Sequence, residues 1–461
     1  MKIEVQNLGA IKEANIDLNK KINIFCGYNN TGKTYLAYVI YYLLSQFVFP
    51  SRILKKEEID SIFKNEEIEI DIDPNDISKY KEETIEKVKK SLDSIFGISS
   101  EDSERVFLDF NIKINSTKHE ECNYYEEAIT ESFKVSNLLF SLNKENSSNK
   151  IRIIPDKSND YKLSDANKYI DLLLSAKILQ ILSFSPVYND AAFFPVERNS
   201  IYTFNKELSL SRNALIDQMQ KLSKNDDINP FELLEQGSKR YPNAVKDCLN
   251  IANDLENVSK TKGDYFEIAS EIEKNLLEGV VSLSKDGNVR FQPNKCLKKN
   301  GLLPIHMTAS IVKTLSSLVF YLKHLAKKGE LIIIDEPEMN LHPNSQIILT
   351  HILAKLVNSD LRLLISTHSD YILREFNNLI MANCINNKNS KLETHPEYKD
   401  ILLDKKDFGV YYFSNIKSKK VIVKTLEVSE EGFDIESIDT TISKQNEIAE
   451  ELYYILKYGD E

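Results

Sequence analysis

Almost uninterrupted runs of apolar residues mark three strands that we expect to be buried. They cover residues 22–26, 331–334 and 361–365, and helix-like segments follow the first two at residues 35–49 and 345–357. A strand that is apolar on nearly every residue is covered on both faces, which is typical of the parallel sheets of α/β proteins. The pattern therefore predicts an α/β fold with a mostly parallel sheet.

Alternation of apolar and polar residues predicts a second kind of strand. Residues 2–5 and 14–18 alternate on either side of a glycine, so we expect a small antiparallel N-terminal sheet. Residues 279–292 predict a hairpin around the turn sequence Lys-Asp-Gly-Asn. Residues 409–413 and 421–428 predict a terminal hairpin in the same way.

The long middle of the chain is less regular, and we expect it to be a large, mainly helical insertion. Residues 51–100 are rich in Lys, Glu and Ile, which favours exposed helices. The other expected elements are strands at residues 106–113 and 132–142, helices at 161–182 and 206–260, an amphipathic helix at 311–326 and a closing helix at 442–456.

Composition and charge narrow the class of protein. The chain has 461 residues, 42% hydrophobic and 28% charged, which is ordinary for a globular protein of two or three domains. A net charge of −11 does not indicate binding to nucleic acid, although such a partner stays open. The short basic segments at residues 87–90 and 417–420 lie among acids, and we interpret them as solvated surface.

Cysteine usage and the apolar segments bear on location. The five cysteines are scattered without a C-x-x-C pair, which argues against a zinc site or a disulfide framework and fits a reducing cytoplasm. The N-terminus lacks the layout of a secretory signal. The most apolar run, residues 35–49, is too short to span a bilayer, so we expect no membrane partner.

A phosphate-binding pattern follows the first buried strand. Residues 27–34 read Gly-Tyr-Asn-Asn-Thr-Gly-Lys-Thr and fit G-x-x-x-x-G-K-[ST] between a strand and a helix. The glycines let backbone N–H groups approach phosphate oxygens, the Lys reaches the terminal phosphates, and the Thr hydroxyl holds Mg²⁺. A chance match in an unrelated loop is the alternative, and the strand–loop–helix context argues against it. The residues expected to bind the nucleotide are Gly27, Asn29, Asn30, Thr31, Gly32, Lys33 and Thr34.

Acidic residues end the second buried strand. Asp335 and Glu336 follow the apolar run directly, and the carboxyl ends of such strands are where open α/β sheets bind ligands. We expect Asp335 to hold Mg²⁺ together with Thr34, and Glu336 to polarise the attacking water. A solvated acidic turn is the alternative interpretation. The preceding phosphate loop favours the nucleotide role.

Two further residues complete the candidate site. His368 follows the third buried strand, where it would sense the γ-phosphate, although a buried helix cap is an alternative. Ser310 opens the amphipathic helix before the Asp335 strand. A Ser at that position is usually an N-cap, but it can also hold a phosphate that belongs to a second subunit.

The order of these motifs resembles that of the ABC-type AAA ATPases of the SMC, RecF and OLD branch. The sequences Leu-His-Pro at residues 341–343 and Thr-His-Ser at 367–369 are typical of the prokaryotic RecF/OLD-like members, many of which serve in anti-phage defence. The resemblance implies ATP and Mg²⁺ as cofactors, hydrolysis with Glu336 and His368 as catalytic residues, and a head-to-head homodimer or higher oligomer. Each nucleotide would then be sandwiched between the phosphate loop of one subunit and Ser310 of the other. It also implies an effector protein encoded by a neighbouring gene.

The sequence departs from that family in three ways. Ile311 stands where the signature usually has a small residue, and no clear Gln follows the first half of the core. The segment after His368 is short and contains no D-x-D, so we expect no Toprim nuclease domain. A segment like Pro-Val-Glu-Arg at residues 195–198 occurs in the family, and Arg198 would contact either the nucleotide or a structural carboxylate.

These observations give a division of the chain and three functional hypotheses. We expect a first part of the ATPase core (residues 1–50), an inserted α+β lobe (51–186), a helical lobe with a hairpin (187–302), and a second part of the core with the C-terminal hairpin and helix (303–461). The protein would be a cytoplasmic ATPase that switches an effector in anti-phage defence. The alternatives are a RecF-like DNA repair ATPase and a slow-turnover, nucleotide-dependent scaffold.

Overall fold

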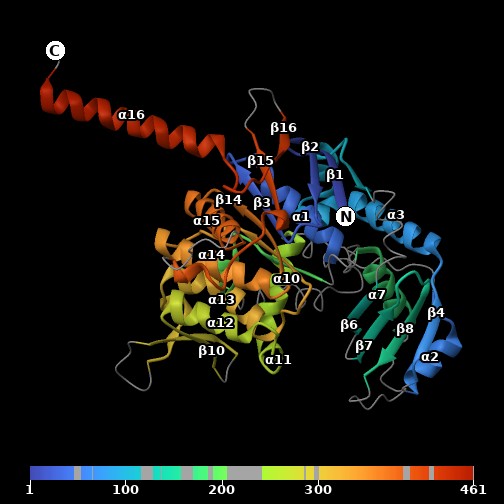
Figure 1. The fold of residues 1–461 in the computed structure, drawn as a ribbon. Helices are drawn as coiled ribbons and strands as arrows, with labels where there is room; N and C mark the ends of the chain where they lie inside the picture. The colour runs from blue at the N-terminus through green and yellow to red at the C-terminus, as the bar shows by residue number, and fades with distance from the viewer. Residues whose placement is uncertain are drawn as a thin grey trace, which may run out of the picture.

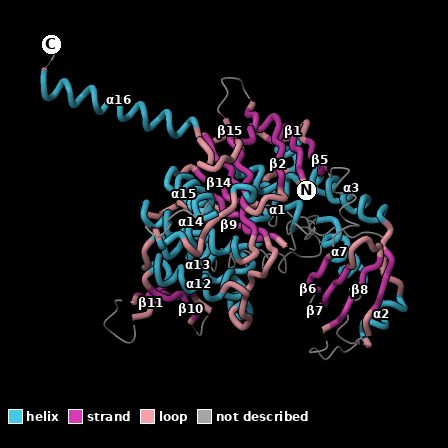
Figure 2. Tube along the Cα trace, viewed as in Figure 1, coloured by secondary structure: helices cyan, strands magenta, loops and turns pink. Residues whose placement is uncertain are grey.

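A nine-stranded sheet forms the centre of the molecule, with strand order β5-β1-β2-β16-β15-β3-β14-β13-β9 (Figures 1 and 2). The computed structural model describes residues 1–45, 53–64, 66–115, 128–135, 138–156, 170–184, 190–204, 241–284, 287–294, 301–387, 395–414 and 420–459. Much of the expected helical segment 206–260, the start of the 161–182 helix and part of the 279–292 turn lie outside these residues.

Parallel strands make up one half of this sheet, and nearly all of their residues are buried. Its members are β15 (Phe408–Phe413), β3 (Ile22–Gly27), β14 (Arg362–Thr367), β13 (Leu331–Asp335) and β9 (Ala191–Phe194). The three apolar runs of the sequence are β3, β13 and β14, so the prediction of a buried parallel sheet is confirmed.

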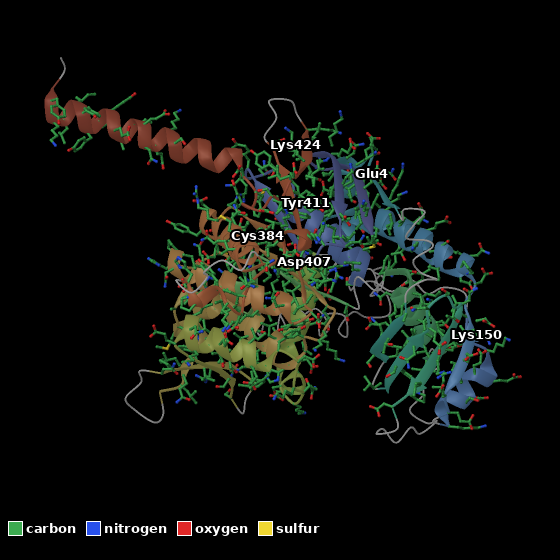
Figure 3. The ribbon with its side chains drawn as sticks, viewed as in Figure 1. Glu4, Lys150, Cys384, Asp407, Tyr411 and Lys424 are labelled. Carbon is green, nitrogen blue, oxygen red and sulfur yellow. The ribbon has the colours of Figure 1, made fainter. Side chains whose placement is uncertain are left out.

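The other half of the sheet is mixed. The predicted N-terminal pair is confirmed as β1 (Lys2–Leu8) and β2 (Ile11–Asp17), and β5 (Asn111–Asn115) adds to its edge. The predicted terminal hairpin pairs β15 with β16 (Val421–Leu426). This hairpin lies within the sheet, because β16 pairs with β2 and β15 pairs with β3. Figure 3 labels Tyr411 of β15, whose hydroxyl accepts a hydrogen bond of 2.7 Å from the Asp17 backbone N–H.

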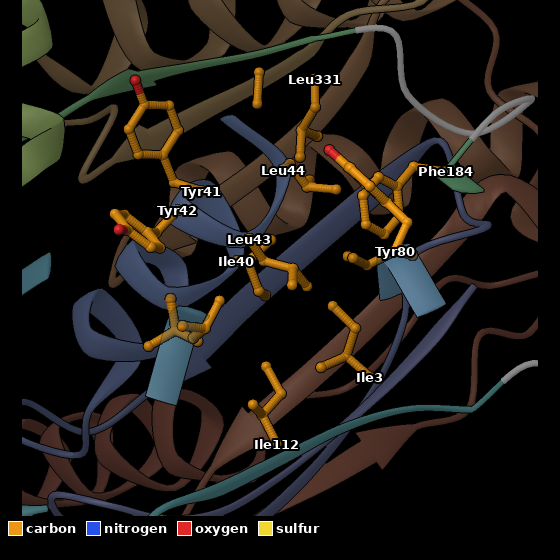
Figure 4. Close-up of a cluster of buried hydrophobic side chains, with 14 of the residues drawn as sticks. Ile3, Ile40, Tyr41, Tyr42, Leu43, Leu44, Tyr80, Ile112, Phe184 and Leu331 are labelled. Carbon is orange, nitrogen blue, oxygen red and sulfur yellow. The ribbon is translucent and has the colours of Figure 1, made fainter. Parts of the chain in front are cut away.

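Helices cover both faces of the parallel half and give two hydrophobic clusters. Leu331 and Ile333 of β13 belong to the cluster that includes α1 (Lys33–Ser45), and part of it is drawn in Figure 4. Ile332 and Ile334 belong to the opposite cluster. The helices of that second cluster are α13 (Ser310–His324), α14 (Pro343–Asn358) and α15 (Asp370–Asn387).

An inserted lobe follows α1, built on a separate antiparallel sheet of order β4-β8-β7-β6. Its elements are α2 (Lys56–Phe63), β4 (Ile68–Asp71), α3 (Pro74–Lys90), α4 (Leu92–Phe96), α5 (Ser100–Val106), β6 (Ile129–Val135), β7 (Leu138–Lys144), β8 (Lys150–Pro155) and α7 (Ile170–Phe184). Lys150, labelled in Figure 3, pairs with Glu69 on its surface at 2.9 Å.

Two strand predictions in this lobe are wrong. Residues 106–113 are not one strand, because α5 continues to Val106 and β5 begins at Asn111. The Ser99 side chain caps α5 by accepting a hydrogen bond from the Asp102 N–H, and this local cap outweighs the strand-like pattern. Residues 132–142 are likewise two strands, β6 and β7, which pair as an antiparallel hairpin.

The remaining elements lie between β9 and the second half of the core. They are α10 (Asn243–Asn253), α11 (Leu255–Val258), α12 (Phe266–Ile272), the π-helical turn Glu273–Leu277, β10 (Gly279–Leu283), β11 (Val289–Pro293) and β12 (Leu303–Pro304). The predicted hairpin is confirmed as β10 and β11, and β12 adds a third strand.

The C-terminal helix α16 (Glu436–Tyr458) is present but does not close the fold. Figure 1 shows it extending away from the body of the molecule. The side chains described for it, from residue 443 onward, are exposed. The predicted helix is therefore present, but the prediction that it packs onto the fold is wrong. Among the described helices, none is long and apolar enough to cross a membrane.

Candidate nucleotide-binding site

Three strand ends bring the predicted site residues together. In the sheet register, Asp335 at the end of β13 is opposite Ser366 of β14, and Thr367 of β14 is opposite Cys26 of β3. Because the strands are parallel, their carboxyl ends meet at the same edge of the sheet. Asp335 is thereby placed beside the loop that follows β3, although the two are far apart in sequence.

The loop between β3 and α1 has the backbone that a phosphate loop requires. Gly27 and Gly32 have φ values of 122° and 94°, a region that favours glycine. A Cβ at Gly27 would lie 2.4 Å from the carbonyl oxygen of Phe413, so β15 packs directly on this glycine. The helix begins at once, because Leu36 N–H donates to Gly32 O at 3.0 Å. The N-terminal N–H groups of α1 therefore lie at the loop, where they can face a bound phosphate.

Lys33 reaches back over the loop. Its ammonium donates to the backbone oxygens of Tyr28 at 2.7 Å and Gly27 at 3.2 Å. Burial lowers the pKa of Lys33 to about 8, and the negative charge of Asp335 opposes this shift. A buried ammonium whose contacts are neutral carbonyls is suited to an anion, which would offset the cost of desolvation.

Oxygen atoms suited to Mg²⁺ gather around Asp335. The Thr34 hydroxyl donates to Asp335 Oδ2 at 2.8 Å, and the Ser366 hydroxyl donates to Asp335 Oδ1. Asp335 is 1% exposed. Hydroxyl and carboxylate oxygens are the ligands that Mg²⁺ prefers, so these residues fit the expected ion. The sequence prediction missed Ser366, although it stands two residues before the chosen His368.

Glu336 turns away from Asp335 at the end of the strand. Its φ is 48°, unusual for a residue other than glycine, and its N–H donates to Ser366 O at 2.9 Å. The Glu336 carboxylate lies 3.8 Å from His368 Nε2. Burial, followed by the charge of Asp335, raises the pKa of Glu336. A carboxylate with a raised pKa is a better general base for water.

His368 is held by a residue that the sequence prediction did not select. Its backbone N–H donates to Glu338 Oε1 at 2.7 Å, so Glu338 fixes the loop after β14. Burial, and then the charge of Lys33, lowers the pKa of His368 to about 4. The imidazole is therefore neutral at neutral pH and can donate one hydrogen bond and accept another.

Arg198 supports the backbone at the end of β13, where Asp335 and Glu336 lie. Its guanidinium donates to the backbone oxygens of Pro195 at 2.9 Å, Asp335 at 2.5 Å and Glu336 at 2.6 Å. The side chain is fully buried, and this burial lowers its pKa to about 10. From the sequence, Arg198 was expected to contact either the nucleotide or a structural carboxylate. The three hydrogen bonds go instead to backbone carbonyl oxygens.

Ser310 lies outside this network. It is the first residue of α13, is exposed, and is not the N-cap, which is Ala309. Among the described residues, the hydrogen bonds that join the phosphate loop to Asp335 and His368 do not involve Ser310. Its role therefore stays a prediction.

A separate cavity of about 360 Å³ borders β9 and the helices α1, α10 and α13. Its polar side chains include two bonded pairs, Tyr41 with Asp247 at 2.7 Å and Tyr321 with Glu330 at 2.9 Å. The phosphate loop and Asp335 do not line it, so it is not the predicted nucleotide site.

The parallel sheet, the phosphate loop and the Asp-Glu strand end define a P-loop ATPase. The chain belongs to the AAA ATPase domain family, whose profile matches residues 1–373. This confirms the predicted kinship with AAA ATPases. A comparison with curated proteins gave no match.

The solved structures similar to this chain include SMC heads. One is an Smc head bound to the C-winged helix domain of ScpA, 12% identical, covering 93% of this chain and 98% of that one, with a TM-score of 0.33. Another, derived from Pyrococcus furiosus, is an Smc head with an extended coiled coil bound to the C-terminal domain of ScpA, with 12% identity, 97% and 98% coverage and a TM-score of 0.33. The SMC head domain from Thermotoga maritima has 8% identity, 93% and 98% coverage and a TM-score of 0.30.

Proposed function

We propose that the protein binds ATP with Mg²⁺, hydrolyses it, and closes as an ABC-type dimer around the nucleotide. The observation that carries this proposal is the bond from Thr34 of the phosphate loop to Asp335 at 2.8 Å. It joins the two halves of the nucleotide motif in one place. The buried ammonium of Lys33 beside them supports a polyphosphate as the ligand.

The residues divide the chemistry among themselves. Lys33 and the loop N–H groups bind the phosphates. Thr34 and Asp335 would hold Mg²⁺, and the ion would neutralise charge on the phosphate oxygens. Glu336 orients a water and accepts its proton as the water oxygen bonds to the γ-phosphorus. The bond from that phosphorus to the bridging oxygen breaks, and ADP and phosphate leave. Neutral His368, close to Glu336, donates a hydrogen bond to the transferring group.

The variant Glu336→Gln tests this proposal. It keeps the shape of the side chain and removes the proton acceptor, so we expect unchanged ATP affinity and a turnover at least about 100-fold lower. Closed dimers should accumulate with ATP and be absent without it, as measured by mass. The matched control is Glu431→Gln on the exposed surface, which should behave as the unmodified chain. Normal turnover by Glu336→Gln would remove the catalytic assignment.

The dimer itself has a second test. We propose that Ser310 of one subunit holds the γ-phosphate bound by the other, because Ser310 is exposed and is the first residue of α13. Ser310→Glu places a negative charge against that phosphate. We expect it to bind ATP as well as the unmodified chain but to form no closed dimer, even combined with Glu336→Gln. Closed dimers in the double variant would refute the contact.

We further propose that closure switches a separate effector protein in anti-phage defence. The family-like order of motifs supports this, and the inserted lobes at residues 51–186 and 187–302 offer the surface for such a contact. Co-expression with the product of a neighbouring gene tests it. We expect a complex whose effector activity differs between Glu336→Gln and Lys33→Ala. ATP-dependent, salt-sensitive binding to DNA, without such a complex, would instead indicate the DNA repair function.

A further inference from the structure

The β9 cavity, the space of about 360 Å³ beside β9, has the position and size of a ligand site. Its walls come from the core, through α1, β9, α10 and α13, and from the inserted lobe, through β6 and α7. Because β9 is the last strand in the order of the large sheet, the cavity lies at the edge of the sheet. Pockets for small molecules typically measure about 300–1,000 Å³ and often lie at boundaries of this kind.

Two tyrosine–carboxylate pairs line the β9 cavity. Tyr41 of α1 donates to Asp247 Oδ2 at 2.7 Å, and Tyr321 of α13 donates to Glu330 Oε2 at 2.9 Å. Each tyrosine ring also packs edge-on against a phenylalanine of β9, with ring centroids 5.6 and 5.5 Å apart. The two carboxylates are therefore held beside an aromatic wall. This arrangement suits a ligand with a charged end and an apolar body.

A third carboxylate, Asp190 just before β9, adds to the negative charge of the cavity. Burial, and then the charge of Asp190, raises the pKa of Glu330 to about 7. Burial also raises the pKa of Asp247, and the charge of Asp190 adds to that shift. Within the described part of the chain, none of the three carboxylates forms an ion pair with a lysine or an arginine. A cation in the cavity would relieve their mutual repulsion.

A buried hydroxyl gives an independent indication of a ligand. Ser317 of α13 lines the β9 cavity and is 7% exposed, and its Oγ has no hydrogen-bond partner in the described structure. A ligand atom bonded to this hydroxyl would offset the cost of burying it. In the described structure, the Asp247 carboxylate accepts one hydrogen bond, from Tyr41, so its Oδ1 stays open. An ammonium has three N–H donors and no acceptor, so it matches such oxygens.

Three lysines also line the β9 cavity, but they are not paired with these carboxylates. Lys177 donates to Gln180 Oε1 at 3.0 Å. Lys327 and Lys328 are exposed, so solvent screens their charges. Lys327 opposes the shift of Glu330, yet the pKa of that carboxyl stays raised. The carboxylates therefore decide the sign of the charge that the cavity favours.

We propose that the β9 cavity binds a small organic cation, a primary amine on an aromatic or apolar body. The ammonium lies beside Asp247 and Glu330, and the body lies against the phenylalanines of β9. The Ser317 hydroxyl accepts a hydrogen bond from the ligand. The phosphate loop and Asp335 do not line this cavity, so binding of the amine requires no nucleotide.

Titration calorimetry of the nucleotide-free full chain with 2-phenylethylamine tests the proposal. The neutral analogue is 2-phenylethanol, and the anionic analogue is 3-phenylpropanoate. We expect the amine to bind with a Kd of about 1 mM or below, at least about tenfold more tightly than either analogue. No binding of the amine at about 10 mM, or equal binding of the amine and the alcohol, would overturn the proposal. Tighter binding of the anion would assign the cavity to its lysines and would also overturn it.

Two variants test which residues hold the amine. D247N/E330Q removes two charges but keeps an acceptor for each tyrosine hydroxyl, so amine affinity should fall at least about tenfold while the affinity for 2-phenylethanol stays the same. Ser317→Ala removes a hydroxyl that has no partner to lose, and it should weaken amine binding at least about threefold.

The matched control for both variants is Glu431→Gln on the exposed surface, which should keep the full amine affinity. Circular dichroism and ATP affinity verify that each variant is folded. Unchanged amine affinity in D247N/E330Q would refute the carboxylate site, and unchanged affinity in Ser317→Ala would refute the hydroxyl contact. Because amine binding is measured without nucleotide, its outcome is independent of the proposed ATPase.

Discussion

The substitution Arg198→Met tests whether the buried guanidinium holds the end of β13, where Asp335 and Glu336 lie. The substitution keeps a long side chain of similar volume but removes the guanidinium donors to the backbone oxygens of Pro195, Asp335 and Glu336. The position is buried, but two of the three oxygens keep a second donor. The backbone N–H of residue 198 donates to Pro195 O at 3.1 Å, and the Met339 N–H donates to Glu336 O at 3.2 Å. Loss of the charged donor should therefore lower the free energy of unfolding by about 1–3 kcal/mol.

The same change should slow hydrolysis more than it weakens binding. Glu336 has a left-handed backbone, and its carbonyl is held by Arg198, so its side chain should lose its position when the guanidinium is removed. A misplaced base costs about 10- to 100-fold in turnover. ATP affinity should change little, because the phosphate contacts lie on Lys33 and its loop.

Urea unfolding followed by circular dichroism and steady-state ATP hydrolysis measure the two effects. The chain has no Trp, so a fluorescence assay would rest on tyrosine alone. The control is Arg362→Met, which removes a surface donor to Asn19 O at 3.0 Å and should cost less than about 1 kcal/mol. If Arg198→Met equals this control in stability, the support role is wrong. If it loses ATP affinity with normal turnover, Arg198 contacts the nucleotide instead.

The remaining predictions concern the charged groups of the loop. Lys33→Ala should abolish detectable ATP binding in calorimetry while the chain stays folded, and retained affinity would contradict the phosphate role. The pKa of His368 is lowered from 6.5 to about 4, so its contribution to stability is fully present above about pH 6.5 and is lost as the pH falls towards 4. His368→Asn should therefore lose less stability than the unmodified chain across that range in urea titrations, and parallel profiles would contradict the assignment. Between pH 6.5 and 8, the rate of hydrolysis should show no inflection from His368.

The C-terminal hairpin shows how distant segments support the phosphate loop. Tyr28 N–H donates to Phe413 O at 3.3 Å, and a side chain at Gly27 would collide with that same oxygen. The end of β15 therefore limits both the sequence and the shape of the loop. A truncation that removes the hairpin would be expected to disturb nucleotide binding, although no hairpin residue is among the expected phosphate contacts.

The sequence by itself determined the local features of this protein. Apolar runs located β3, β13 and β14, because a strand buried on both faces must be apolar throughout. The glycines and Lys33 located the phosphate loop, because its backbone and charge are written in consecutive residues. Asp335 and Glu336 were found in the same way, from the end of a run. In each case, the information lies within about ten residues.

Only the tertiary structure decided which distant groups meet. Ser366, Glu338 and Arg198 act through bonds to residues on other strands and loops, and such bonds depend on sheet order rather than on local pattern. Insertion of the terminal hairpin between β2 and β3 is of the same kind, since a hairpin pattern does not specify its neighbours. The exposure of α16 is also a feature that only the tertiary structure decided. An apolar stripe requires a partner surface, but it does not say whether that surface belongs to the same chain.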